Sequence, residues 1–225
     1  MKDYFWGLGL KTLKRWTRSG LLETTISEIT KISSPNVLSI GGFGPVDIRL
    51  KEVVQNLGGQ YLTLDIEASH SPVIIGDVEN IEALLSSTDF VPDVVIALEV
   101  LEHVQNTSRA ISGIYSVLSP NGVFILSTPW IIPIHDRPFD FYRFTPAALQ
   151  QYLAEFDSVR ILARGNYYDS VVALLLRGLF SGKSLGKFFL ILGGLLSFLS
   201  GRPKVYDQLD HLDSCIGYMA ISKKF

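Results

Sequence analysis

Residues 90–104 read FVPDVVIALEVLEHV, and this stretch decides the expected fold. Residues 93–98 are a short run rich in Val and Ile, as in a strand buried on both faces of a parallel sheet. The run ends in Glu99, Glu102 and His103, and a helical pattern follows. Open α/β sheets bind their ligands at the carboxyl ends of such strands. We therefore expect a ligand site here, although acidic residues also suit a solvated first helical turn.

A glycine-rich loop lies upstream of this stretch. Residues 36–40 (NVLSI) are an expected strand that runs into GGFGP, and an amphipathic helix follows up to Gly58-Gly59. Strand, glycine loop and helix open nucleotide-binding folds, because glycines let the backbone approach a ligand closely. Ordinary tight turns use glycines as well, so the loop is a weak signal by itself.

Two further acids follow the next two expected strands. Residues 60–64 predict a second strand that delivers Asp65, about twenty residues beyond the glycine loop, where an acid can bind a ribose hydroxyl pair. Glu67 could share that task or be solvated. Asp77 follows a short strand at 73–75, where it could meet an adenine amino group or cap the next helix. Both interpretations of Asp77 stay open.

The remaining pattern continues to alternate strands with helices, which predicts an α/β fold. We expect a Rossmann-like, doubly wound, mostly parallel seven-stranded sheet. Residues 1–33 would form an N-terminal helical extension. Residues 34–225 would form the main domain, with an apolar helical insertion at 171–203. The last three strands are expected at 123–127, 159–163 and 216–222, and helices at about 107–118 and 145–155.

Composition excludes several classes of protein. The chain has 225 residues, of which 47% are hydrophobic and 19% charged, so it is globular rather than disordered. Its net charge of -2 gives no reason to expect nucleic acid as a partner. Cys215 is the only cysteine, which excludes a disulfide framework and points to a reducing compartment. The N-terminus does not read as a secretion signal, so we expect a cytoplasmic protein.

Residues 36–225 resemble the class I S-adenosylmethionine-dependent methyltransferases. VLSIGGFG, LTLDIE, GDVENI and PDVVIALEVLEHV look like their first four motifs, and SPNGVFILSTP like the strand that closes the site. The subgroup it most resembles is bacterial, type 11-like, and associated with polysaccharide or glycan biosynthesis. Its members share a turn like IPIHDRPFDFYRFTP and an apolar insertion before the last strand. The chain departs from the family where Ser39 replaces an acid and where Phe43 and Pro45 stand near glycine positions.

The resemblance implies S-adenosylmethionine as the cofactor and methyl transfer to an oxygen, or less often a nitrogen, of a small-molecule, sugar or lipid-linked glycan acceptor. An alcohol must lose its proton, so a histidine near the sulfonium is the expected base. His135 is preferred over His103, because it lies in the long loop at 128–146 that should face the acceptor. Otherwise His135 only anchors that loop, through Asp136 or Asp140. The implied cofactor-binding residues are Gly41, Gly42, Gly44, Asp65, Ile66, Asp77, Val78 and Glu99.

The same loop holds the residues expected to bind the acceptor. They are Trp130, Asp140, Tyr142 and Arg143. Tyr142 and Arg143 could bind a sugar or an anionic group. Alternatively, Arg143 pairs with Asp140 and holds the turn.

Three other readings remain beside this one. The set Glu99, Glu102, His103 and His135 is similar to the ligands of some metal-dependent O-methyltransferases, and would suit Mg²⁺, Zn²⁺ or Mn²⁺. We expect no metal, because many members carry Glu-x-x-Glu-His without one. The altered first motif would also fit a degenerate binding or scaffold protein. A dinucleotide-dependent oxidoreductase is disfavoured, because Asp47 stands where the third glycine belongs.

Residues 171–200 contain two apolar blocks around Ser181-Gly182-Lys183-Ser184. Neither block has the roughly 20 residues that a membrane-spanning helix needs. Two short helices that cover the core or form a homodimer contact would explain the pattern. The alternative is a peripheral contact with the inner membrane face, where Arg177 and Lys187 would meet anionic headgroups.

Overall fold

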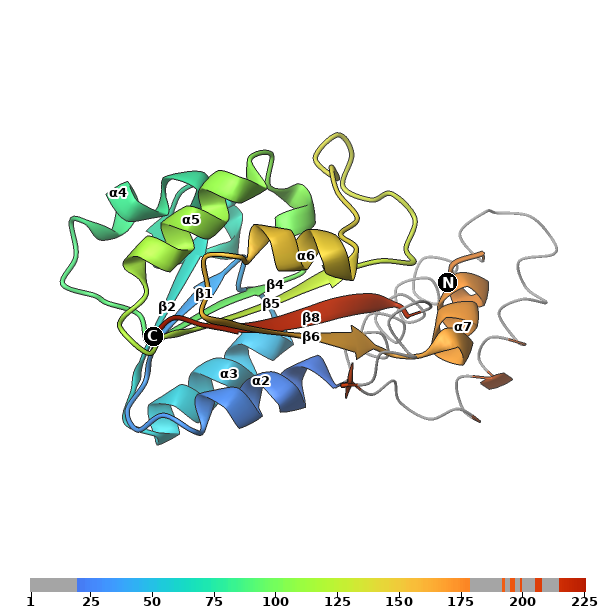
Figure 1. Cartoon of the computed structure of the whole chain (residues 1–225), viewed down its shortest axis with the longest axis horizontal. Coiled ribbons are helices and arrows are strands. Elements are labelled where there is room, and N and C mark those ends of the chain that lie inside the picture. The colour runs from blue at the N-terminus through green and yellow to red at the C-terminus, as the bar shows by residue number, and fades with distance from the viewer. Residues whose placement is uncertain (1–19, 179–191, 193–194, 197–198, 200–204, 208–214) are drawn as a thin grey trace.

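The computed structural model describes residues 20–178, 192, 195–196, 199, 205–207 and 215–225 (Figure 1). Among these residues, eight strands form one sheet in the order β3-β2-β1-β4-β5-β8-β6-β7. Seven of them match the predicted strands, and β7 is a two-residue edge strand that the sequence did not indicate. The predicted α/β fold is thus confirmed. The bounds are Asn36–Ile40 (β1), Gln60–Asp65 (β2), Ile74–Ile75 (β3), Val94–Leu98 (β4), Val123–Pro129 (β5), Ser158–Arg164 (β6), Val205–Tyr206 (β7) and Gly217–Lys223 (β8).

Strand β4 lies at the middle of the parallel part of the sheet. It pairs with β1 on one side and with β5 on the other, both parallel, and β1 pairs in parallel with β2. Strand β8 runs antiparallel between β5 and β6. The carboxyl ends of β1, β2, β4 and β5 therefore meet at one edge of the sheet, which we call the carboxyl edge.

Helices cover both faces of the sheet (Figure 1). Helices α4 (Ile81–Leu85), α5 (Thr107–Val117) and α6 (Pro146–Tyr152) pack on one face. Helices α2 (Leu21–Ile29) and α3 (Pro45–Asn56) pack on the other. In β4, Val95 and Ala97 belong to the first core and Val94 and Ile96 to the second. This double burial explains why β4 is apolar at every position rather than at alternate ones.

Three short 3₁₀ helices follow strands at the carboxyl edge. They are η1 (Ala68–His70) after β2, η2 (Val78–Asn80) after β3 and η3 (Leu101–His103) after β4. The helix that Asp77 was expected to cap is therefore split into η2 and α4. The loop between β5 and α6 ends where the Thr145 hydroxyl accepts a hydrogen bond from the amide of Ala148, as predicted for an N-cap.

The two ends of the predicted domain plan are described only in part. In the extension expected at 1–33, the structure shows α2, and the helix expected near residues 5–16 lies outside the described residues. Helix α7 (Tyr167–Gly178) begins before the predicted insertion, most of which also lies outside them. Within the part of the chain that the structure describes, every helix is too short or too polar to span a bilayer.

Candidate functional site

Glu102 is the most unusual acid at the carboxyl edge. It lies on η3, directly after β4, and its side chain is fully buried. Neither of its carboxyl oxygens has a hydrogen-bond partner among the described residues. Burial, and then the negative charge of Glu99, raise the pKa of Glu102 well above its usual value. Buried polar groups without partners are unfavourable, so Glu102 is a candidate for a functional role.

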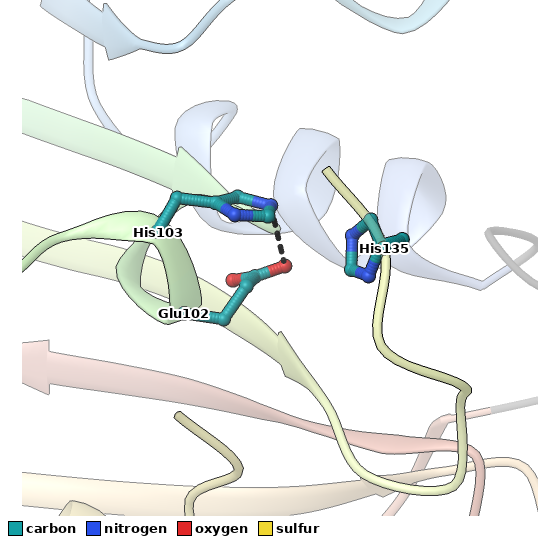
Figure 2. Close-up of side chains that lie close together, drawn as sticks. All are labelled: Glu102, His103 and His135. Carbon is teal, nitrogen blue, oxygen red and sulfur yellow. Dashed lines mark ion pairs between the residues drawn. The ribbon is translucent and has the colours of Figure 1, made fainter. Parts of the chain in front are cut away.

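Two imidazoles lie beside this carboxyl group (Figure 2). His103 follows Glu102 on η3, and its Nε2 lies 3.7 Å from Glu102 Oε1. His135 approaches from the loop after β5, and the two imidazole rings are 4.9 Å apart with an edge-to-face angle of 80°. One ligand atom from each of Glu102, His103 and His135 lies within 4.8 Å of the others. We call these three residues the Glu-His-His cluster.

A backbone contact orients His103. Its Nδ1 lies 2.7 Å from the carbonyl oxygen of Phe139. A carbonyl can only accept a hydrogen bond, so Nδ1 carries a proton, and in the neutral imidazole Nε2 keeps its lone pair. The lone pair is thus on the nitrogen nearest to Glu102. This contact also joins η3 to the loop that carries His135.

Asp140 and Arg143 hold that loop in shape. Asp140 accepts hydrogen bonds from Arg143 Nη1 (2.5 Å) and Nη2 (2.8 Å) and from the backbone amide of His135 (2.8 Å). The bonds from Arg143 hold the pKa of Asp140 well below its usual range. The side-chain Nδ1 of His135 is buried 3.2 Å from Asp140 Oδ2, without the geometry of a hydrogen bond. Of the two readings for Arg143, the structure supports the pairing that holds the turn.

The other two residues predicted to bind the acceptor, Trp130 and Tyr142, also have partners within the fold. Trp130 packs against Tyr218, with ring centroids 6.0 Å apart. The Tyr142 hydroxyl donates a hydrogen bond of 2.8 Å to the carbonyl oxygen of Gln105. Their proposed contact with an acceptor stays a prediction.

Glu99 does not join the Glu-His-His cluster. It accepts hydrogen bonds from Arg164 Nη1 (2.6 Å) and from the Ser127 hydroxyl (3.0 Å). Arg164 is almost fully buried, and a Cβ atom at Gly217 would lie 2.6 Å from its Nη2. The four-residue metal set suggested by the resemblance is therefore corrected to three. Sequence reasoning missed Arg164, whose only signal was a charge at the end of an apolar strand.

The three glycines of the first loop are needed for different reasons. Gly41 and Gly44 have φ angles of +64° and +82°, which residues other than glycine rarely adopt. A Cβ atom at Gly42 would lie 2.3 Å from Asp47 Oδ1 and 2.4 Å from Ser39 Oγ. In contrast, nothing lies within 4 Å of a Cβ atom at Gly44. The backbone at Gly44 is thus open to a ligand.

Asp47 brings an acid beside Ser39, the position where this chain lacks the acid of the family pattern. The hydroxyl of Ser39 donates a hydrogen bond of 2.9 Å to Asp47 Oδ1, and the hydroxyl of Tyr61 donates one of 2.5 Å to the same oxygen. Burial, and then the charge of Asp47, raise the pKa of Tyr61. The sequence alone showed Ser39 as a missing acid, because Asp47 is eight residues away and reaches Ser39 only through the first turn of α3.

Asp65 lies at the end of β2 as predicted, and its carboxylate already has two partners. Oδ1 accepts the amide of Glu67 at 2.8 Å, and Oδ2 lies 2.8 Å from Nδ1 of His70. The His70 ring stacks on Phe43 from the glycine loop, with centroids 4.1 Å apart. Ile66, next to Asp65, is 70% exposed. His70 and Phe43 were not predicted as site residues.

The third strand end supports a structural role for Asp77. Its Oδ1 accepts the amide of Glu79 at 2.9 Å, so Asp77 caps η2. Val78 is buried, which leaves only its backbone for contact with a ligand. A contact of Asp77 with adenine remains a prediction.

Comparison with known proteins gives a family and a fold. The family model described as "Methyltransferase domain" matches residues 18–172. No curated protein matches the chain significantly. A SAM-dependent methyltransferase from Archaeoglobus fulgidus has a similar structure: it is 16% identical, with a TM-score of 0.55 and coverage of 90% of this chain and 94% of its own.

Two other solved structures show that similar folds occur in proteins with different activities. Coclaurine N-methyltransferase, bound to N-methylheliamine and SAH, is 12% identical with a TM-score of 0.55, and the match covers 91% of this chain and 72% of its own. The [4+2]-cyclase SpnF is 13% identical with a TM-score of 0.51, and the match covers 89% and 80%. Because these proteins have different activities, their likeness to this chain establishes the fold and leaves the reaction to the site.

Proposed function

The chain belongs to the methyltransferase domain family, and on that premise we propose that it transfers the methyl group of S-adenosylmethionine to a hydroxyl oxygen of its acceptor. The acceptor is a small molecule, a sugar or a lipid-linked glycan. The observation that carries the choice of oxygen is the Glu-His-His cluster, because a hydroxyl must lose its proton during transfer and this cluster offers imidazoles to take it.

The residues at the ends of β1 and β2 fit the proposed cofactor. Positive φ angles at Gly41 and Gly44, with open space at Gly44, let a ligand approach the backbone. The N-terminus of α3, where Val46 and Asp47 follow Pro45, suits the carboxylate of the methionine moiety. Phe43 and Ile66 are exposed apolar side chains suited to the adenine ring. Further contacts are proposed for Gly42, Asp77, Val78 and Glu99, and Asp65 is proposed to orient the group that binds the ribose.

S-adenosylmethionine supplies a methyl group on a sulfonium, so the protein mainly aligns donor and acceptor. His135 is the proposed base. Its Nδ1 is buried against Asp140, which leaves Nε2 as the atom that can take the proton. His103 is the second candidate, because its Nε2 also keeps a lone pair. Trp130, Asp140, Tyr142 and Arg143 are proposed to shape the acceptor side.

Replacement of His135 tests this proposal. In His135→Ala, turnover should fall by about 10²–10⁴ while cofactor affinity is retained. Release of S-adenosylhomocysteine would be measured with monosaccharides, nucleotide sugars and lipid-linked glycans as acceptors. Glu52→Gln is the control, because Glu52 lies on α3 and its side chain is 55% exposed. Equal turnover in His135→Ala and the control would reject His135 as the base.

A divalent cation in the Glu-His-His cluster is a second candidate function, and a specific observation favours it. The buried carboxyl oxygens of Glu102 have no partner and lie beside the lone pair of His103. Metal-ligating histidines commonly donate their other N–H to a backbone carbonyl, as His103 does to Phe139. One carboxylate and two imidazoles suit Zn²⁺, Mn²⁺ or Fe²⁺ better than Mg²⁺. A bound cation would lower the pKa of an acceptor hydroxyl.

Chelation separates the two candidates. If His135 acts as a base without metal, exhaustive EDTA treatment leaves turnover intact. If EDTA abolishes turnover and Zn²⁺ or Mn²⁺ restores it, His135 is a ligand instead. Calorimetric titration of Mn²⁺ gives a readout that needs no acceptor: Glu102→Gln should abolish binding at the cluster, and the exposed-acid control Glu52→Gln should retain it.

We also propose that residues 171–200 rest on the inner membrane face and bring a lipid-linked acceptor to the site. In their described part, Leu174, Leu195 and Leu199 are 48%, 55% and 70% exposed, which supports an apolar contact surface. Flotation with anionic vesicles at low and moderate salt tests this. A protein that stays in the soluble fraction under both conditions has no such contact, and a dimer contact measured by size-exclusion chromatography would then explain the exposed surface.

A further inference from the structure

Residues 65–71 form a turn that is held by its own hydrogen bonds. Asp65 Oδ1 accepts the amide of Glu67, and Glu67 Oε1 accepts the amide of Ser69 at 3.2 Å. Ser71 then ends η1 in the left-handed conformation, with φ +55°. Such side-chain to backbone bonds favour a tight turn over a continued helix. The turn brings His70 back onto Asp65.

His70 is held from two sides. Its Nδ1 lies 2.8 Å from Asp65 Oδ2, and its ring stacks on Phe43 at 4.1 Å with an angle of 18° between the planes. An ionised carboxylate only accepts hydrogen bonds, so Nδ1 carries a proton, and in the neutral imidazole Nε2 is then an acceptor. Phe43 belongs to the loop after β1 and His70 to the turn after β2. The two contacts thus join the loops between which the proposed cofactor would lie.

The accessible polar group at this strand end is the imidazole rather than the carboxylate. The side chain of Asp65 is 9% exposed and that of His70 is 33% exposed. Both oxygens of Asp65 already have a partner, whereas Nε2 lies on the ring edge opposite the one that contacts Asp65.

We propose that His70 contacts the ribose of the cofactor, with its Nε2 accepting a hydrogen bond from a ribose hydroxyl. Asp65 is then a positioning residue that fixes the tautomer and direction of the ring, and Phe43 supports its face. The inference rests on the proposed use of S-adenosylmethionine and assigns one contact within it. A side chain held in advance by a hydrogen bond and a stacked ring loses little freedom when the ligand binds.

The opposite arrangement would make His70 a plug that a ribose must displace from Asp65. Displacement would break the bond to Asp65 and the stack on Phe43 together. Direct contact keeps both. The two arrangements predict opposite effects of removing the imidazole, which makes them separable by affinity.

A ligand pair with and without the ribose hydroxyls tests the contact. Calorimetry would compare S-adenosylhomocysteine with its 2′,3′-dideoxy analogue on the wild type, His70→Ala and His70→Gln. His70→Ala should weaken S-adenosylhomocysteine about five- to tenfold, the effect of one net hydrogen bond. The wild type should prefer the hydroxylated ligand, and His70→Ala should lose most of that preference. Histidine nitrogen chemical shifts should show the Nδ1–H tautomer in wild type and its loss in Asp65→Asn.

Glu52→Gln is the control, because Glu52 lies on α3 outside the turn and its side chain is 55% exposed. It should keep the preference for the hydroxylated ligand. Tighter binding by His70→Ala would identify His70 as a plug and overturn the inference. An unchanged preference in both His70 variants would place the ribose contact elsewhere. If the wild type binds S-adenosylhomocysteine, either result rejects only this contact; if it does not, the proposed cofactor itself is rejected.

Discussion

The carboxyl edge has two halves that are built differently. The cofactor half consists of the loops after β1 and β2, residues 41–47 and 65–71. Its polar contacts span short stretches of chain: eight residues from Ser39 to Asp47, five from Asp65 to His70 and 14 from Asp47 to Tyr61. The acceptor half consists of the segment after β4 and the loop after β5, residues 99–104 and 130–144. Its contacts span 36 residues from His103 to Phe139 and 65 from Glu99 to Arg164.

This difference predicts which substitutions alter ligand affinity and which also alter the stability of the fold. A local turn can lose one contact while the strands that carry it stay paired. The acceptor half depends on strands β4, β5 and β6 lying in register, because Arg164 on β6 reaches across to Glu99 after β4. Changes in the cofactor half should therefore mainly alter affinity, and changes in the acceptor half should also alter folding.

The largest effect is expected for Arg164→Met. The substitution leaves the carboxylate of Glu99, which is 13% exposed, without its cation, and loss of one partner of a buried ion pair costs about 3–5 kcal/mol. Urea denaturation would measure the loss. Arg49→Met is the control, because Arg49 and its partner Glu52 are both 55% exposed, and such surface pairs contribute about 0–1 kcal/mol. Equal losses in the two variants would refute the division into halves.

A smaller effect, on affinity, is expected for Asp65→Ala. The variant should bind S-adenosylhomocysteine about five- to tenfold more weakly, as His70→Ala does, because Asp65 acts on the ribose through His70. Its urea midpoint should stay close to that of the wild type, because its side-chain partners are within five residues of it. Calorimetry and denaturation on the same preparation would check both. A lowered urea midpoint together with an unchanged affinity for S-adenosylhomocysteine would contradict the comparison.

The smallest effect concerns Glu102 and pH. Its pKa is raised in the folded protein above the ordinary value of 4.5, so the folded state holds the proton more tightly than the unfolded state does. The contribution of Glu102 to the free energy of unfolding is therefore greatest below pH 4.5. It falls as pH rises from 4.5 toward the raised pKa of Glu102. Glu102→Gln removes this loss, so its stability relative to wild type should increase as pH rises.

Thermal unfolding between pH 4 and 8 would measure this, with Glu82→Gln as an exposed control on α4. The melting temperatures of wild type and Glu102→Gln should diverge as pH rises. Parallel curves would show that the buried carboxyl is stabilised by a partner, and would favour a cation in the Glu-His-His cluster.

Much of the site could be predicted where chemistry follows a strand directly. Glu102 and His103 were expected at the edge because residues 93–98 are apolar throughout and then stop. Asp65 was expected for the same reason at the end of β2. His135 was expected in the loop after β5, because that loop is too long and too rich in proline and aromatics to be a simple link. The structure places it beside His103.

The sequence by itself thus determined the order and type of the strands, the edge at which polar groups gather and the family, because these follow from local periodicity and motif spacing. Only the tertiary structure decided which polar groups are taken by the scaffold. Arg164 donates a hydrogen bond to Glu99, and Asp47 accepts one from Ser39, where the family has an acid. Asp65 contacts the Nδ1 atom of His70. Each of these pairings depends on the distance between side chains after folding, which spacing along the chain does not encode.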